Sequence, residues 1–210
     1  IALKVSLIDV PSLPVKIEGS VDGWIDELSI KTPSGKLPVT FYRNEALEEM
    51  PDFTDYSMKN RTYRYYEGEA LYPFGYGLSY TTFEYSAPVL SDTLMTGRTP
   101  VKASVEVKNT GTRDGYEVVQ LYIRDILTPN WTRPVKELKG FQKVFIPAGE
   151  STVVEFDITP EMLSWYAVDQ FNMSGSGKPL NAELVLEAGD FNIMTGPNSR
   201  DTKSVKLTVK

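Results

Sequence analysis

Aromatic and basic side chains crowd the stretch of the chain between residues 61 and 83. Pyranose rings present patches of C–H groups that pack against the flat faces of tyrosine and tryptophan, and arginine donates hydrogen bonds to sugar hydroxyls. We therefore predict a carbohydrate-binding site at Tyr63, Arg64 and Tyr66, joined by Trp131 from a loop bounded by prolines. The alternative interpretation is that the aromatic side chains of this stretch pack it onto the sandwich and the neighbouring domain.

Paired carboxylates are the second group of residues that could do chemistry. Hydrolysis of a glycosidic bond uses one carboxyl group as acid and a second as nucleophile or base. Glu67 and Glu69 flank a glycine beside the aromatic stretch. Other acidic pairs lie upstream: Glu48 with Glu49, and Asp52 with Asp55. Because most acidic side chains lie on protein surfaces, we expect surface charge or local ion pairs here and assign no catalytic residue.

The absence of cysteine and histidine excludes several chemistries from this sequence. Without cysteine there is no disulfide framework and no thiolate nucleophile. Without histidine there is neither a serine–histidine–aspartate arrangement nor an imidazole metal ligand. The spacing of the Asp and Asn residues fits no calcium loop. We therefore expect no metal and no other cofactor.

Charge and hydropathy narrow the classes of partner. The net charge is −6, with no cluster of lysine and arginine, which argues against a nucleic-acid partner. No apolar run reaches the length that spans a bilayer, so we expect no membrane segment. We expect a soluble bacterial protein, and its compartment stays open between the cytoplasm and secretion or the periplasm.

Short stretches with a period of two dominate the second part of the chain and predict β-strands. Apolar residues alternate with polar ones from Val101 to Val107, and again over 117–125 and 154–158. Further strands are predicted at 138–146, 163–168, 182–186, 191–193 and 205–209. About seven or eight strands are typical of an immunoglobulin-like sandwich. Trp165, within an alternating stretch, is expected in the core.

The first part of the chain reads differently, as an irregular and partly extended segment. A turn at Pro33–Gly35 leads into an extended stretch at 37–41, and 44–50 is a short helix candidate. Residues 24–30 fit a helical turn or a strand equally well. The density of Tyr, Gly and Pro in 61–83 predicts no helix there, and Gly75 and Gly77 allow tight turns. We divide the chain into an N-terminal segment, 1–84, and a β-sandwich, 85–210.

Four motifs in this order resemble the C-terminal part of glycoside hydrolase family 3, which contains β-glucosidases and β-xylosidases. They are Pro33-Ser-Gly-Lys-Leu-Pro-Val-Thr-Phe41, the run from Arg61 to Phe83, Val107-Lys-Asn-Thr-Gly111, and Thr132-Arg-Pro-Val-Lys-Glu-Leu-Lys-Gly-Phe141. The resemblance covers residues 33–202. It implies that the sandwich is the fibronectin type III-like domain that ends the family's chains.

The resemblance also implies where catalysis takes place. In the family the nucleophilic aspartate lies on a (β/α)8 barrel and the acid/base residue usually on an α/β sandwich domain, and neither domain is visible here. The glycine-rich stretch that normally precedes the Pro33 motif is replaced by Glu18-Gly-Ser-Val-Asp-Gly-Trp24. This departure indicates that the α/β domain is truncated, rewritten or supplied from elsewhere.

The expected function is therefore that of a non-catalytic accessory portion. It would brace the catalytic barrel and α/β domains of a parent hydrolase, in the same or a separate chain, while β-linked glucose or xylose is hydrolysed there. The alternative is a stand-alone module that binds β-linked oligosaccharides or another protein.

Overall fold

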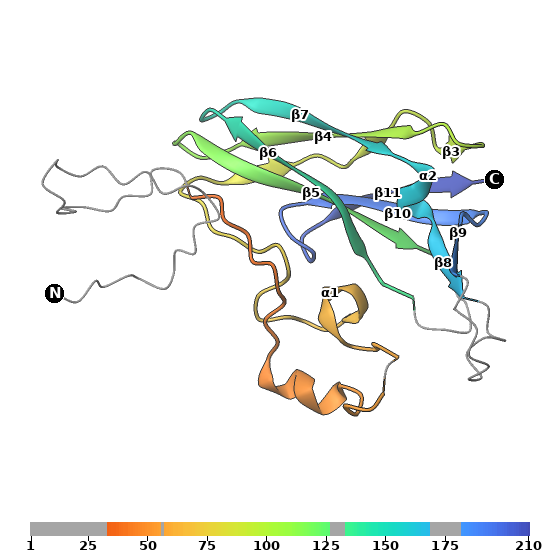
Figure 1. Cartoon of the computed structure of the whole chain (residues 1–210). Helices are drawn as coiled ribbons and strands as arrows, with labels where there is room; N and C mark the ends of the chain where they lie inside the picture. The colour runs from red at the N-terminus through yellow and green to blue at the C-terminus, as the bar shows by residue number, and fades with distance from the viewer. Residues whose placement is uncertain (1–32, 56, 127–132, 169–181) are drawn as a thin grey trace, which may run out of the picture.

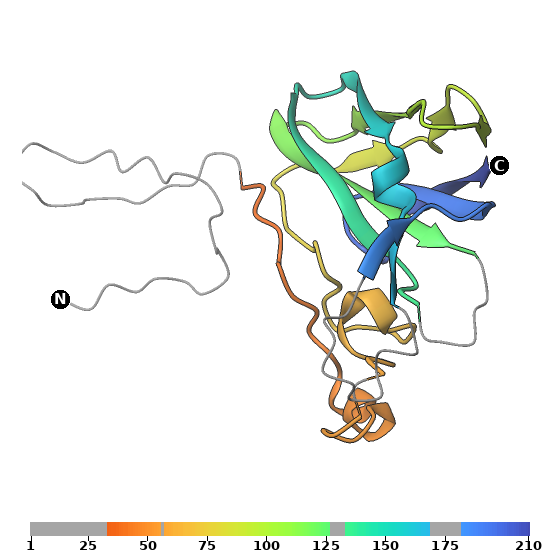
Figure 2. The same cartoon turned by 45° about the vertical axis from the view of Figure 1, so that its right-hand side comes forward.

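The computed structural model describes residues 33–55, 57–126, 133–168 and 182–210. Two layers of β-strands pack face to face, and a segment made of residues 33–82 extends from them (Figure 1). We call this segment the arm. In the rotated view of Figure 2, most of the arm also lies below the sandwich. The predicted β-sandwich with an irregular, partly extended segment before it is confirmed.

The first sheet is built around β4 (Val101–Asn109), which pairs antiparallel with β7 (Ser151–Ile158). The period-two alternation of β4 places Val101, Ala103, Val105 and Val107 on its buried side. On its other edge β4 pairs with two short strands, β1 (Phe83–Tyr85) and β2 (Val89–Leu90). The strands predicted from alternation at 101–107 and 154–158 are therefore confirmed.

The second sheet contains five strands in the order β3-β11-β10-β5-β6. Their bounds are Leu94–Met95 for β3, Lys203–Val209 for β11, Gly189–Gly196 for β10, Gly115–Asp125 for β5 and Glu137–Ile146 for β6. All neighbours are antiparallel except β3 and β11, and a register shift occurs in β5 at Leu121/Tyr122. This shift is typical of a β-bulge, which bends and twists a strand locally.

A third, two-stranded sheet pairs β8 (Trp165–Val168) with β9 (Ala182–Val185). The strand predicted at 163–168 begins later than expected, because the helical turn α2 (Pro160–Leu163) precedes it and Pro160 stands at the first helical position. The prediction that Trp165 belongs to the core is wrong. Its ring is half-buried, and the guanidinium of Arg133 lies 4.4 Å from the ring centroid.

The hydrophobic core lies between the two large sheets and contains buried residues from Tyr85 to Val209. Tyr85, Leu121, Phe156, Phe191 and Leu207 are among its members. Fully burying one such aliphatic or aromatic side chain contributes about 1.5–3 kcal/mol. Within the described residues, the arm supplies no member of this core cluster.

The arm folds back on itself, with 37–41 running antiparallel to 72–76. Phe41 and Tyr72 exchange backbone hydrogen bonds of 2.9 and 3.2 Å, and the Leu37 N–H donates to the Tyr76 carbonyl. The predicted short helix is confirmed as a 3-10 helix, η1 (Asn44–Glu49). The prediction of no helix in 61–83 is wrong by one turn, α1 (Thr62–Tyr65). None of the helices formed by the described residues has the length and apolar composition needed to cross a bilayer.

Candidate functional site

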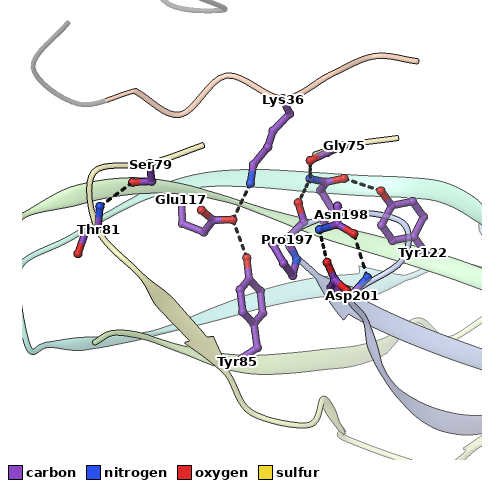
Figure 3. Close-up of polar contacts among 11 residues, drawn as sticks. Lys36, Gly75, Ser79, Thr81, Tyr85, Glu117, Tyr122, Pro197, Asn198 and Asp201 are labelled. Carbon is purple, nitrogen blue, oxygen red and sulfur yellow. Dashed lines mark hydrogen bonds and ion pairs between the residues drawn. The ribbon is translucent and has the colours of Figure 1, made fainter. Parts of the chain in front are cut away.

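The described part of the chain concentrates its buried polar contacts where the arm meets β5 (Figure 3). Lys36 Nζ on the arm lies 2.9 Å from Glu117 Oε1, and the Tyr85 hydroxyl donates to the same oxygen over 2.9 Å. The Lys36 and Glu117 side chains are only 15% and 6% exposed. We call Lys36, Tyr85 and Glu117, together with Gln120, the arm clamp.

Burial controls the electrostatics of the arm clamp. It raises the pKa of the Tyr85 phenol well above its usual value, and the negative charge of Glu117 raises this pKa further. The phenol is therefore neutral and a hydrogen-bond donor at every pH near neutrality. A carboxylate that accepts from a cation and a phenol at once forms short, charge-assisted hydrogen bonds. The arm clamp can thus hold two segments together, although it contains no nucleophile and base in reacting geometry.

Gln120 makes the second contact of the arm clamp. Its side-chain nitrogen donates to the carbonyls of Gly75, in the arm, and Pro197, after β10, and its oxygen accepts from the Tyr122 hydroxyl. Gly75 has a φ of +78°, and a Cβ built there would lie 2.0 Å from the Gln120 side-chain oxygen. Both facts require glycine at this position. The predicted turn at Gly75 is confirmed.

Two further contacts extend the arm clamp along the arm. A Cβ at Gly77 would lie 2.0 Å from the Gly35 carbonyl oxygen, so the two halves of the arm approach each other at glycines. At the end of the arm, the Thr81 hydroxyl donates to the Asn109 side-chain oxygen over 2.6 Å. Asn109 belongs to the Val107–Gly111 motif, which therefore has a structural role in joining the arm to the sandwich.

The residues predicted to bind carbohydrate fall in different places. The Tyr63 ring stacks on Phe74, with centroids 4.0 Å apart, and its hydroxyl accepts from the Leu138 N–H. The Arg64 guanidinium points to Glu137, 3.3 Å away. Trp131 lies outside the described residues. Sugar contact by these residues stays a prediction.

α1 does bring two of the predicted residues to one cleft. Tyr63 and Tyr66 line a cleft of about 280 Å³ between the arm and the sandwich, opposite Arg124, Lys136 and Arg200. The aromatic stretch thus both packs against the sandwich, through Tyr63, and borders an open space. These two interpretations of the stretch are compatible.

Side chains of the acidic pairs form ion pairs and hydrogen bonds at the surface, as expected. Glu67 lies 3.6 Å from Arg124 and Glu69 lies 3.8 Å from Arg43. Asp52 accepts from the Thr54 N–H and hydroxyl, and these hydrogen bonds lower the pKa of its carboxyl group. Across the described ranges, no group of three or more carboxylates is placed to hold a metal ion.

Sequence reasoning did not identify the arm clamp. One signal was present: Glu117 occupies the side of β5 that also carries the buried residues Val119 and Leu121. A carboxylate on the core side of a strand must find a partner, because burial of an unpaired charge is strongly unfavourable. The identity of its partner, Lys36, is not contained in any local pattern.

The fold and the arm clamp define the class of the protein, a fibronectin type III-like β-sandwich with an arm fixed to one sheet. The family model described as "Fibronectin type III-like domain" matches residues 117–199. This match confirms the prediction made from strand number and from the resemblance.

Whole-chain comparisons extend this result. The chain is 40% identical over 177 residues to a xylan 1,4-beta-xylosidase of Xylanibacter ruminicola, a match that covers 84% of this chain and 18% of that protein. It is 38% identical over 185 residues to a periplasmic beta-glucosidase of Salmonella typhimurium, covering 81% and 22%. The chain therefore spans about a fifth of the length of these curated relatives.

Solved structures give the same answer. The GH3 beta-glucosidase of Bifidobacterium adolescentis superposes with a TM-score of 0.67 at 30% identity, over 84% of this chain and 26% of that one. A beta-glucosidase of Erythrobacter marinus superposes with a TM-score of 0.65 at 40% identity, over 85% and 22%. The chain corresponds to the C-terminal region of glycoside hydrolase family 3 enzymes and contains their fibronectin type III-like domain.

Proposed function

We propose that this chain is the non-catalytic C-terminal accessory portion of a family 3 β-glycosidase, a β-glucosidase or β-xylosidase that degrades carbohydrate. Its partners would be the catalytic barrel and α/β domains of the parent hydrolase, in the same or a separate chain. The relatives support this proposal, since the chain corresponds to only about a fifth of each. Hydrolysis of β-linked glucose or xylose would take place on the remaining four fifths.

The observation that carries the proposal is the apolar surface of the arm. More than half of the exposed large hydrophobic side chains of the described residues lie in the arm, although the arm is the smaller part. They are Val39, Phe41, Leu47, Phe53, Met58, Leu71, Tyr72, Leu78 and Tyr80. Phe53 is 85% exposed. Exposed apolar side chains gathered in one segment are typical of an interaction surface, and we assign this surface to the contact with a catalytic domain.

The arm clamp turns this surface into a brace. Because the arm supplies none of the core cluster within the described residues, polar contacts such as those of the arm clamp and of Thr81, with the packing of Tyr63, hold it against the sandwich. An arm that is fixed to the sandwich and exposes apolar side chains can join the sandwich rigidly to a catalytic domain. Preorganised elements bind at lower entropic cost than mobile ones.

Two measurements on the purified 210-residue chain test this function against its alternatives. The brace predicts no turnover of aryl β-glucosides or β-xylosides and no saturable binding of neutral xylo- or cello-oligosaccharides. A stand-alone carbohydrate-binding module would bind such an oligosaccharide and lose binding on Trp131→Ala. Enzyme-like turnover by the pure chain would contradict the proposal outright.

The intact mass of the source polypeptide carrying this sequence is the complementary test. The proposal predicts a mass several times the 23.6 kDa of this chain, or co-purification with a larger hydrolase chain. A polypeptide of about 23.6 kDa that purifies alone would refute the brace.

A further inference from the structure

The cleft of about 280 Å³ beside α1 is positively charged, and the proposed bracing function does not explain this charge. Its arm wall includes Tyr63, Tyr66 and the backbone of Gly68, and its sandwich wall includes Arg124, Lys136 and Arg200. Glu67 is the one carboxylate among the described lining residues. The cleft therefore carries three cationic groups against one anionic group.

Lys136 is the least compensated of the three cations. It is half-buried, and its ammonium donates to the Ser199 carbonyl over 2.6 Å. Within the part of the chain that the structure describes, Lys136 has no carboxylate partner, whereas Arg124 faces Glu67 and Arg200 pairs with Asp201. Burial lowers the pKa of Lys136, and the positive charge of Arg124 lowers it further. A carboxylate placed between Lys136 and Arg124 would offset both effects, because an opposite charge nearby favours the charged form of the lysine.

The opposite wall offers a surface for a sugar ring. Tyr66 lines this wall of the cleft, and its ring is held in place by the backbone of Gly68, on which a Cβ would fall 2.5 Å from the Tyr66 hydroxyl oxygen, and by an edge contact with Tyr42. Phenol faces pack against the C–H patches of pyranoses. The volume lies at the lower end of small-molecule sites, which measure about 300–1,000 Å³, so it suits one sugar unit better than a longer oligosaccharide.

We propose that this cleft binds a single sugar unit that carries a carboxylate, of the hexuronate class. The carboxylate accepts hydrogen bonds from Lys136 and Arg124, in place of the exposed Glu67, and the ring packs against Tyr66. This site is independent of the brace, which depends on the apolar surface of the arm.

Isothermal titration calorimetry of the 210-residue chain tests the site, with methyl β-glucuronide as the probe and methyl β-glucoside as its neutral match. The uronide should bind at least about tenfold more tightly than the glucoside. Arg124→Gln and Lys136→Met should each weaken uronide binding by about tenfold or more. Glu67→Gln should tighten it, because it removes a competing carboxylate. Arg98→Gln, an exposed arginine that does not line the cleft, should leave it unchanged.

Thermal unfolding of each variant separates loss of the site from loss of the fold, and Arg124→Gln remains informative if Lys136→Met is unstable. Equal affinity for the two glycosides, absence of uronide binding, or unchanged uronide affinity in Arg124→Gln would overturn the proposal. None of these outcomes bears on the brace, whose tests use neutral oligosaccharides, turnover and the mass of the source polypeptide.

Discussion

Lys36 of the arm and Glu117 of β5 form a nearly enclosed ion pair of 2.9 Å, although 81 residues separate them in the sequence. The Tyr85 hydroxyl donates to the same carboxylate oxygen. A buried charge that loses its partner keeps its desolvation cost without compensation. We therefore expect this pair to stabilise the arm against the sandwich more than an exposed ion pair would.

Removal of the lysine tests the energetic weight of this pair. Lys36→Met should lower the free energy of unfolding by about 3 kcal/mol, since Glu117 is then buried without its cation. Urea unfolding at pH 7 measures this change. Lys102→Met is the matched control, because Lys102 pairs with Glu155 on an exposed face. It should change stability by less than about 1 kcal/mol.

Two outcomes would contradict this account of the pair. Equal losses of unfolding free energy in the two lysine variants would show that burial of the pair adds nothing to its contribution. A native-like stability for Lys36→Met would show that Tyr85 alone satisfies the carboxylate.

The approach of the arm to β5 predicts a steric effect at Gly75. Gly75→Ala should destabilise the chain and increase hydrogen exchange at the Leu37 and Gly75 amides, which bond across the arm. Gly97→Ala is the control, since Gly97 also has a positive φ, +67°, but open space where a Cβ would stand. Both variants share a backbone cost of about 1 kcal/mol, and the Gly75 variant adds the clash with Gln120. Equal effects of the two variants would exclude the clash.

The raised pKa of Tyr85 predicts a loss of stability in alkali. Burial keeps this phenol protonated in the folded state, whereas the unfolded chain releases its proton near pH 10. Stability from this group is fully present below pH 10 and falls as the pH rises above it, by up to about 1.4 kcal/mol per pH unit. Tyr122, whose pKa burial also raises, acts in the same direction.

Urea unfolding between about pH 8 and 11, in steps of about half a pH unit, measures how the free energy of unfolding changes with pH. Tyr85→Phe should lose stability at pH 7, by about 1.5–3 kcal/mol for a hydrogen bond to a charged group, and should show a shallower decline in alkali. Tyr80→Phe, which changes an exposed arm tyrosine, should keep the parental slope. An unchanged slope in Tyr85→Phe would assign the alkaline loss to other groups.

The strands that could be predicted are those whose own sequence alternates between apolar and polar residues. Val101, Ala103, Val105 and Val107 alternate with polar residues, and the structure buries all four. β1, β2 and β3 were not predicted, because two or three residues cannot display a period. These strands exist through pairing with β4 or β11, and Ser91, which follows β2, exchanges hydrogen bonds with Lys102 of β4.

The arm clamp was less predictable for the same physical reason. Gly75 could be predicted as a turn residue, because glycine in a Tyr- and Pro-rich stretch is a local signal for a turn. Its contact with Gln120 could not, because it joins positions 45 residues apart. Trp165 was misplaced because alternation indicates a buried side and does not report the cation that covers the ring. The division at residues 84 and 85 into two domains stays a prediction.

The most direct test of the brace is hydroxyl-radical footprinting of the arm in two states. The same aromatic side chains, Phe41, Phe53 and Tyr72, are compared in the isolated chain and in the polypeptide or complex purified from its source, with Val153 of β7 as the exposed reference. The brace predicts that these arm residues react with hydroxyl radicals roughly several-fold more slowly in the source material, because docking removes their side chains from solvent. Equal reactivity of these residues in the two states would contradict it.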